Sequence, residues 1–297
     1  MEFQQETGRI GDLLLQAAAR LEKAGVESAR IDAELLLGSL LNKSRTELYL
    51  AAGEKLEAKL IGGFSRLIER RAGREPLAYI LGTTEFWSRT FTLSPAVLIP
   101  RPETEVLVEA VLNRKNRQAT GGAYLDLCCG SGIICITLAL ETELQVHHMV
   151  GVDISRSALS ICRQNCINHG VDQSIQLVQG DLGSCFAEQR SFRLITANPP
   201  YIDSAEMTGT LQPEVVDFEP HLALDGGEEG LELIRTIIDF LPWMLAPGGD
   251  FFMEIGSTQA ATVREIFAQT NGPPVYESID VLKDYAGRDR IVHARRL

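Results

Sequence analysis

Apolar residues recur at helical spacing through the first seventy residues of the chain. One stripe with the 3.6-residue period of a helix consists of Ile10, Leu13, Leu14, Ala17, Ala18 and Leu21. A second helix is expected after Ser28, a preferred N-cap type, with apolar positions at Ile31, Leu35, Leu36 and Leu40. A third stripe, which ends near Gly73, contains Leu56, Leu60, Phe64 and Leu67. Residues 1–73 are therefore predicted to form a helical bundle. Its faces offer a docking surface without visible chemistry, and we expect this domain to serve substrate recognition.

The pattern changes between residues 74 and 100. Aromatic and β-branched residues concentrate at positions 85–87 and 89–93, which predicts a β-hairpin linker. The linker ends in Ile99-Pro100-Arg101-Pro102, where two prolines restrict the backbone. The next helix is expected to start near Glu103.

Residues 101–297 alternate between short apolar runs and helical patterns. Strands are predicted at 124–127, 150–153, 175–178 and 194–197, with a helix at 155–168 between the second and third. A turn at 247–249 leads into a strand at 251–255, and an antiparallel strand is expected at 290–294. Such alternation is typical of an α/β domain with a parallel sheet covered on both faces.

Composition narrows the class of protein. The chain has 297 residues, 45% of them apolar and 23% charged, as in ordinary globular proteins. No apolar run reaches the ~18 residues of a membrane helix, and the first residues do not form a secretory signal, so we expect a cytoplasmic protein. The net charge of −12 disfavours a general phosphate binder. The basic run Arg66, Arg70, Arg71 and Arg74 is predicted to be a solvated helix face.

None of the six cysteines forms a C-x2-C pair of the zinc type, and no disulfide is expected in a reducing compartment. Cys162 and Cys166 would share one helix face, as a two-ligand metal clip or as buried small hydrophobes. The second interpretation is favoured, and no metal is predicted.

A nucleotide-binding signature follows the first predicted strand. Gly130 and Gly132 form a turn into a helix, and Asp153 ends the second strand, where a carboxylate accepts ribose hydroxyls. Asp181 follows the third strand, where an adenine amino group could be recognised. The third glycine of a dinucleotide fingerprint is missing, and Asp126 would repel phosphate but attract a cation. S-adenosyl-L-methionine, with its ammonium and sulfonium groups, fits this pattern.

The quartet Asn198-Pro199-Pro200-Tyr201 directly follows the fourth predicted strand. Such a quartet suits an acceptor that is an amide or aromatic amino nitrogen, which is a poor nucleophile because its lone pair is delocalised. The Asn198 side-chain oxygen and the Pro199 carbonyl could accept its two N–H bonds, while Tyr201 packs against the flat group. Catalysis would then consist mainly of positioning and preorganised electrostatics.

The glycine turn, Asp153 and the quartet together resemble those of class I amino methyltransferases that use S-adenosyl-L-methionine. Further motifs favour one family among these enzymes. They are residues 99–105 (IPRPETE), Phe218-Glu219-Pro220, Leu224-Asp225-Gly226-Gly227, and Lys283-Asp284-Tyr285 with Asp289-Arg290. With the glycine turn, Asp153 and the quartet, they resemble the peptide chain release factor glutamine methyltransferases (the HemK/PrmC family).

The resemblance implies a Rossmann-like class I sheet with an N-terminal helical bundle and a β-hairpin linker. It also implies methylation of the glutamine in the Gly-Gly-Gln motif of release factors. The implied cofactor contacts are Asp126, Leu127, Cys128, Cys129, Gly130, Gly132, Asp153, Asp181, Leu182 and Asn198. The implied substrate contacts are Asn198, Pro199, Pro200 and Tyr201, with catalysis assigned to Asn198, Pro199 and Tyr201. Family members commonly have glycine and threonine where this chain has Cys128 and Cys129.

Two other functions fit the same motifs. A nucleic-acid amino methyltransferase could use the quartet on adenine or cytosine, and a non-catalytic adapter could use the helical domain to bind ribosomal factors. The negative charge argues against the first, and the intact quartet against the second. We expect a monomer whose partner is a release factor, with no direct contact to nucleic acid or membrane.

The segment 202–229 is expected to cover the substrate, with Glu214, Asp217, Glu219 and Asp225 suited to a basic partner loop; the alternative is a solvated acidic loop. Arg101 is expected to pair with Glu103 or Glu105, or to lie near the site.

Overall fold

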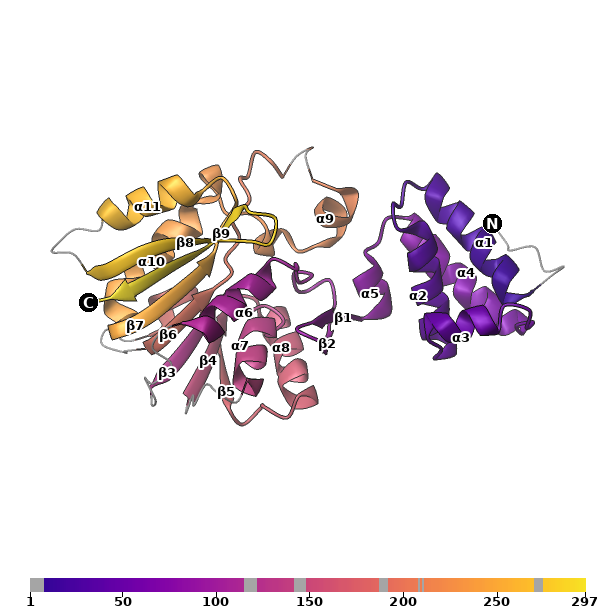
Figure 1. Ribbon diagram of the computed structural model, residues 1–297, viewed down its shortest axis with the longest axis horizontal. Helices are drawn as coiled ribbons and strands as arrows, with labels where there is room; N and C mark the ends of the chain where they lie inside the picture. The colour runs from indigo at the N-terminus through magenta and orange to yellow at the C-terminus, as the bar shows by residue number, and fades with distance from the viewer. Residues whose placement is uncertain are drawn as a thin grey trace. The chain divides into compact units, whose positions relative to one another are not determined.

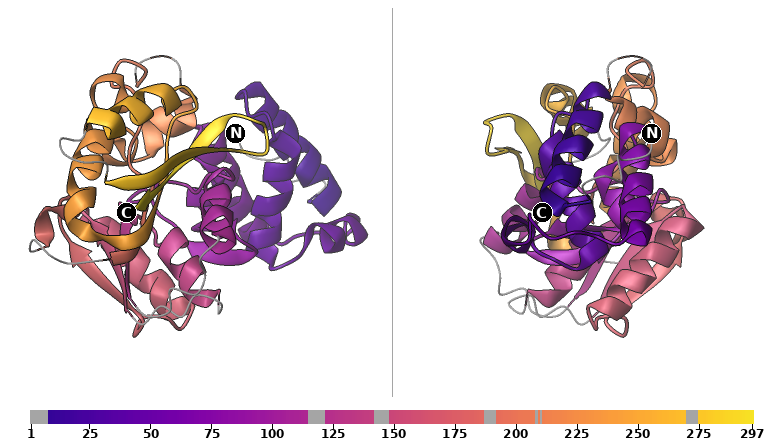
Figure 2. Two further views of the ribbon diagram at one scale, coloured as in Figure 1. Left: turned by 60° about the vertical axis from the view of Figure 1, so that its left-hand side comes forward. Right: turned by 90° about the vertical axis from the view of Figure 1, so that its right-hand side faces the viewer.

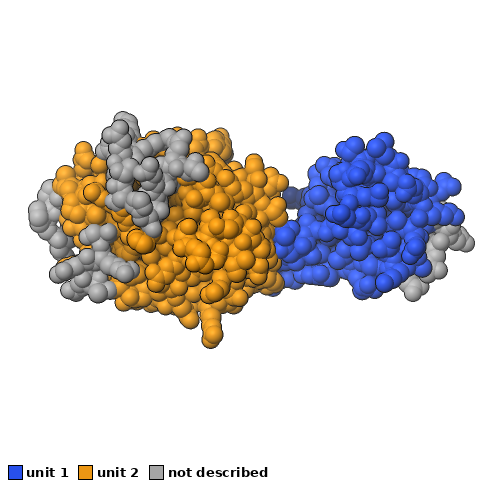
Figure 3. All heavy atoms as spheres, turned by 90° about the horizontal axis from the view of Figure 1, so that it is seen from below, with its two compact units in different colours: residues 1–83, 212–218 blue, residues 84–211, 219–297 orange. Residues whose placement is uncertain are grey.

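The computed structural model describes residues 8–114, 122–141, 148–186, 192–207, 209, 211–269 and 275–297. The chain divides into two compact units, which Figure 3 colours separately. One unit comprises Met1–Thr83 with Gln212–Phe218, and the other comprises Thr84–Leu211 with Glu219–Leu297. The functional division at residues 73 and 100 stays a prediction.

The first unit is a helical bundle, as predicted. Its helices are α1 (Ile10–Lys23), α2 (Ala29–Leu41), α3 (Arg45–Leu50), α4 (Ala58–Ala72), α5 (Leu77–Leu81) and the later α9 (Pro213–Phe218) (Figure 1). The long helices α1, α2 and α4 lie together in both views of Figure 2. They bury one core, which includes Ile10, Leu13, Leu36, Phe64 and Ile68.

The expected apolar face of α2 is only partly correct, because Leu36 and Leu40 pack in the core but the other two positions do not. Ile31 is 46% exposed and Leu35 is 36% exposed, whereas Asp32, Ala33 and Leu37 are buried. Because α2 carries leucines around much of its circumference, periodicity alone does not select the face that turns inward. Ser28 is the N-cap residue, but its hydroxyl donates to the Asp32 carboxylate at 2.7 Å and makes no capping hydrogen bond.

The basic run on α4 is not wholly solvated, which corrects a second expectation. Arg71 is buried, and its Nε donates to Asp32 at 2.7 Å. Its Nη1 donates to Glu214 of α9 at 3.1 Å, and Arg74 pairs with the same carboxylate. A buried guanidinium needs such partners because an unpaired buried charge costs several kcal/mol. These ion pairs attach the 212–218 segment to the helical unit.

The predicted hairpin consists of β1 (Thr83–Phe86) and β2 (Arg89–Thr92). Its turn residues Trp87 and Ser88 both have positive φ, as a type I′ turn requires. The preceding residues of the predicted linker form helix α5, which ends at Gly82 in the left-handed region.

The second unit is built on a seven-stranded sheet with the order β5-β4-β3-β6-β7-β9-β8. The strands are β3 (Ala123–Leu127), β4 (His148–Asp153), β5 (Ile175–Gln179), β6 (Phe192–Ala197), β7 (Leu245–Glu254), β8 (Tyr276–Lys283) and β9 (Asp289–Arg296). The first five are parallel, and β9 pairs antiparallel with both β7 and β8. The predicted parallel sheet and antiparallel last strand are confirmed.

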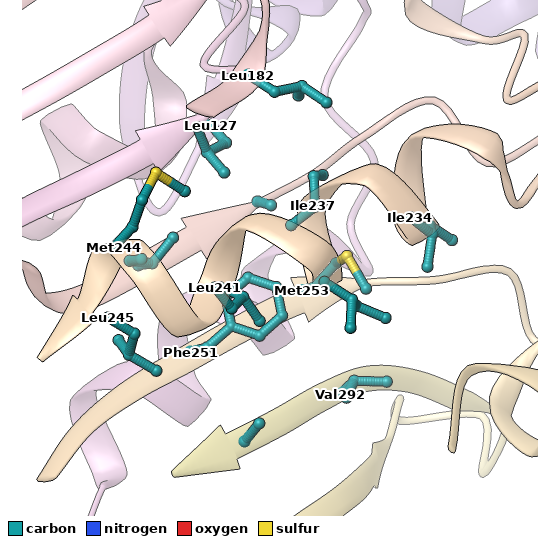
Figure 4. Packing of buried hydrophobic residues seen from close by; sticks show 14 of the residues in the cluster. Leu127, Leu182, Ile234, Ile237, Leu241, Met244, Leu245, Phe251, Met253 and Val292 are labelled. Carbon is teal, nitrogen blue, oxygen red and sulfur yellow. The ribbon is translucent and has the colours of Figure 1, made fainter. Parts of the chain in front are cut away.

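Strand residues alternate between two cores on opposite faces of the sheet, because successive side chains point to opposite sides. On one face, Leu127 and Phe251 pack with helix α10 (Glu232–Met244), as Figure 4 shows, and α11 (Ala260–Gln269) joins this core. On the other face, Tyr124 and Phe252 belong to the core of α6 (Thr104–Asn113), α7 (Ile133–Leu140) and α8 (Arg156–Asn168). Short 3-10 helices lie at Leu182–Cys185, His221–Ala223 and Glu228–Gly230.

The order of the strands locates the site. Strands β4 and β6 flank β3 on opposite sides, so the chain direction across the sheet reverses there. In open α/β sheets, ligands bind at the carboxyl ends of the strands beside such a switch point. None of the described helices is long and apolar enough to cross a membrane.

Candidate active site

The glycine turn after β3 is held to β4 by one carboxylate. Asp153 Oδ2 accepts a hydrogen bond from the Gly130 amide at 2.8 Å, and its Oδ1 accepts one from the Ser155 amide at 2.8 Å. Burial raises the pKa of Asp153, while these two hydrogen bonds lower it. Each carboxylate oxygen has a second lone pair, so Asp153 keeps the capacity to accept ribose hydroxyls.

The turn itself requires unusual backbone conformations. Gly132 has φ of +83°, and a Cβ there would lie 2.6 Å from Cys162 Sγ. Gly130 and Cys128 also have positive φ. The chain thus places a cysteine where the left-handed conformation favours glycine. Burial raises the pKa of the Cys128 thiol, so it is protonated at neutral pH.

Asp126 lies apart from the cavity at this sheet edge. It is fully buried in β3, and its Oδ1 accepts a hydrogen bond from the Thr196 hydroxyl of β6 at 2.5 Å. Burial raises its pKa to about 7. This hydrogen bond joins β3 to β6, and the expected contact of Asp126 with the cofactor stays a prediction.

One cavity runs along the carboxyl ends of the strands from the glycine turn to the quartet. Eight of the residues expected at the site line it: Cys128, Cys129, Gly130, Asp153, Asp181, Leu182, Asn198 and Pro200. The other five expected residues do not line it: Asp126, Leu127, Gly132, Pro199 and Tyr201. The fold therefore brings most of the residues expected to bind the cofactor into the same cavity as Asn198.

Other parts of the lining were not anticipated in detail. They include residues 96–98 with Pro100, and Pro220 with Leu222 and Ala223. Buried Glu219 joins these two segments, since it accepts a hydrogen bond from the Ile99 amide at 3.2 Å and one from Arg101 at 2.6 Å. Arg101 thus pairs with Glu219, in place of the expected Glu103 or Glu105. Sequence distance hid this pair, although the two residues belong to two of the motifs that carried the resemblance.

The expected acidic face of segment 202–229 has its carboxylates mostly in internal contacts. Glu214 pairs with Arg71 and Arg74, and Glu219 pairs with Arg101. Asp225 accepts hydrogen bonds from the Ser204 hydroxyl and the Gly227 amide. Asp217 is exposed. The attraction of this segment for a basic partner stays a prediction.

The quartet is supported by glycines packed against its carbonyl groups. A Cβ on Gly226 would lie 2.8 Å from the Pro200 oxygen, and one on Gly230 would clash with the Tyr201 oxygen. Gln259 Nε2 also donates to the Tyr201 carbonyl at 3.0 Å. The Leu224-Asp225-Gly226-Gly227 motif therefore has a structural role in fixing the loop.

A buried carboxylate lies beneath the quartet. Glu254, the last residue of β7, accepts hydrogen bonds from Thr104 Oγ1 at 2.8 Å and from Tyr201 Oη at 2.9 Å. Asn198 Nδ2 lies 3.4 Å from the same Thr104 oxygen. Sequence reasoning missed Glu254 and Thr104, although a single acid at the end of the apolar run 251–255 was a visible signal.

Four of the six cysteines are buried as small hydrophobes, whereas Cys128 is half-buried and Cys185 is exposed. Cys162 and Cys166 are buried in the core of α7 and α8, together with Cys129 and Cys135. Among the described residues, no group of three or more histidine, cysteine or acidic side chains is arranged to hold a metal ion.

The seven-stranded sheet, with its glycine turn beside the switch point, defines the class I methyltransferase fold. A methyltransferase from Pyrococcus furiosus has a similar fold, with a TM-score of 0.51 and 14% identity over 79% of this chain and 98% of that one. Two family models also match. Residues 12–82 match the PrmC N-terminal domain, and residues 102–229 match the methyltransferase small domain.

Curated relatives narrow the class to one family. The release factor glutamine methyltransferase of Geobacter sulfurreducens is 41% identical over 93% of this chain and 92% of its own length. That of Nitratidesulfovibrio vulgaris is 39% identical over 96% of this chain and 94% of its own length. The chain belongs to the release factor glutamine methyltransferase family, and the resemblance found from its motifs is confirmed.

Proposed function

We propose that this protein transfers a methyl group from S-adenosyl-L-methionine to the side-chain amide nitrogen of the glutamine in the Gly-Gly-Gln motif of peptide chain release factors. Membership in the family supports the reaction and the substrate. The observation that carries the proposal is that Asp153 and Asn198 line one continuous cavity. A donor and an acceptor bound there would be neighbours.

The part of the cavity lined by Gly130, Asp153, Asp181 and Leu182 would hold the methyl donor, and we call it the donor half. Its residues fit the proposed cofactor. The turn at Gly130 leaves room for close approach of a ligand, Asp153 offers carboxylate lone pairs for a ribose, and Leu182 supplies an apolar surface for a flat base. Asp181 lines the same end of the cavity and could accept from an amino group. When bound, this cofactor supplies an electrophilic sulfonium methyl group.

The part of the cavity lined by Asn198 and Pro200 would hold the methyl acceptor, and we call it the acceptor half. It would position a carboxamide. We assign the Asn198 Oδ1 and the Pro199 carbonyl to accept the two N–H bonds of the glutamine, with Pro200 and Tyr201 flanking the flat group. Two acceptors favour the positive charge that develops on nitrogen as it is methylated, and proline restricts the backbone that carries one of them. No strong general base is required, because the proton becomes acidic once nitrogen carries the methyl group.

Mass spectrometry of release factor peptides tests the proposal. We expect the Gly-Gly-Gln peptide to gain the mass of one methylene group after incubation with the protein and the cofactor. A release factor with the glutamine replaced by alanine, and an Asn198→Ala enzyme, are the matched controls. Label transferred instead to DNA or RNA would support the nucleic-acid alternative, and transfer to neither would leave only a binding role.

A further inference from the structure

Glu254 is an acidic residue buried beneath the quartet, outside the lining of the cavity. It is 1% exposed, and burial raises its pKa, while hydrogen bonds from Thr104 and Tyr201 lower it. Burying a carboxylate is costly unless hydrogen bonds compensate. Because apolar residues fill the rest of strand 251–255, an apolar side chain here would be compatible with the core. The cost therefore suggests that the carboxylate has a specific task.

The hydrogen-bond directions around Glu254 define that task. A carboxylate only accepts, so Thr104 must use its single proton to donate to Glu254 Oε2. Toward Asn198, Thr104 Oγ1 can therefore only accept. The Asn198 atom that faces it at 3.4 Å is the donor Nδ2. The carboxylate thus sets the orientation of the Asn198 amide through the threonine.

The consequence lies at the other atom of the amide. With Nδ2 turned to Thr104, Oδ1 is the atom left to accept from a substrate. In the reversed amide, Asn198 would present an NH2 group to the NH2 group of the glutamine, and two donors repel. A threonine with a free proton could stabilise that reversed state equally well.

We propose that Glu254 is a positioning residue that acts through Thr104 to keep Asn198 in the orientation that accepts an N–H bond of the substrate. This proposal rests on the proposed function. Tyr201 provides the second hydrogen bond to Glu254 and so compensates its burial, without taking part in orienting Asn198.

We call the hydrogen-bonded chain from Glu254 through Thr104 to Asn198 the relay. A series of substitutions at Thr104 tests it. Thr104→Ser keeps the hydroxyl, Thr104→Cys offers a weaker donor and acceptor, and Thr104→Val keeps the shape and removes both functions. We expect kcat to fall in the order Ser, Cys, Val, with serine retaining most of the rate and valine losing about 10- to 100-fold, as for the loss of one hydrogen bond to a charged group. The dissociation constant of the cofactor and the KM for release factor should stay within about twofold.

The controls separate this proposal from a merely structural role. A structural role predicts that kcat, cofactor affinity and melting temperature fall together, or that serine fails as badly as valine; either result overturns the proposal. If Thr104→Val does not fold, the ratio of serine to cysteine rates decides, and equal rates overturn it. Absence of release factor methylation by the unsubstituted protein is a different result, because it would reject the proposed function itself.

Discussion

The two halves of the cavity are built by different means. In the donor half, one carboxylate holds backbone amides, since Asp153 binds the amides of Gly130 and Ser155. In the acceptor half, the Asn198 side chain is held by the Thr104 hydroxyl, which is itself hydrogen-bonded to the Glu254 carboxylate. The hydrogen bond that holds the glycine turn joins residues 23 positions apart, whereas Thr104 and Glu254 are separated by 150 positions. A backbone of fixed shape suits the binding of a cofactor, whereas a reacting amide nitrogen requires a hydrogen-bond acceptor in a fixed orientation.

Substitution of the acceptor should produce the largest effect on the reaction. In Asn198→Ala we expect kcat to fall by about 100- to 1,000-fold, as for removal of one preorganised hydrogen-bonding group from an active site. Cofactor affinity should change little, because the glycine turn and Asp153 are untouched. Single-turnover rates and calorimetric titration of the cofactor measure the two quantities. Equal losses in both would show that the halves are not independent.

Substitution in the donor half should give the opposite pattern. In Asp153→Ala the turn loses the hydrogen bond at Gly130, and a bound ribose would lose its acceptor. We expect cofactor affinity to fall by about 10- to 100-fold, from the loss of hydrogen bonds to a charged group. At saturating cofactor, kcat should recover most of its value. Asp153→Asn is the matched control, and a rate that stays low at saturation would contradict the division.

Asp126 should affect stability through pH. Because its folded pKa is raised from 3.8 to about 7, the folded state binds a proton more tightly than the unfolded state. The stability associated with the protonated carboxyl is present below about pH 4 and is lost as pH rises toward 7. Asp126→Asn should therefore become progressively more stable than the unsubstituted protein over this range. Each pKa unit corresponds to about 1.4 kcal/mol, so urea unfolding should detect the trend. A difference that does not vary with pH would contradict it.

The smallest expected effect concerns the turn itself. Cys128 has φ of +56°, a conformation that costs a non-glycine residue about 1–2 kcal/mol. Cys128→Gly should raise the free energy of unfolding because it relieves this strain. The gain should be about 1 kcal/mol or less, because the greater entropy of glycine in the unfolded state offsets part of it. The neighbouring Cys129→Gly is the control, and it should destabilise because Cys129 is buried without positive φ. Destabilisation by both would show that Cys128 is not strained.

The predictability of each region from sequence follows the same contrast. The strands, the glycine turn and the quartet were predicted because each is specified by neighbouring residues. The buried face of α2 and the burial of Arg71 were not, since the pairing of Asp32 with Arg71 joins two helices. Strand β8 was also missed, because its burial alternates irregularly and it carries charged residues along its length. Long-range ion pairs leave no local pattern, and the relay beneath Asn198 is of this kind.

The most direct test of the account is a crystal structure of the protein with S-adenosylhomocysteine and a Gly-Gly-Gln peptide. We predict that the glutamine nitrogen lies between Asn198 Oδ1 and the Pro199 carbonyl, facing the sulfur, with Asn198 Nδ2 turned toward Thr104. An Asn198 amide turned away from the glutamine, or a glutamine side chain bound outside the cavity, would contradict it.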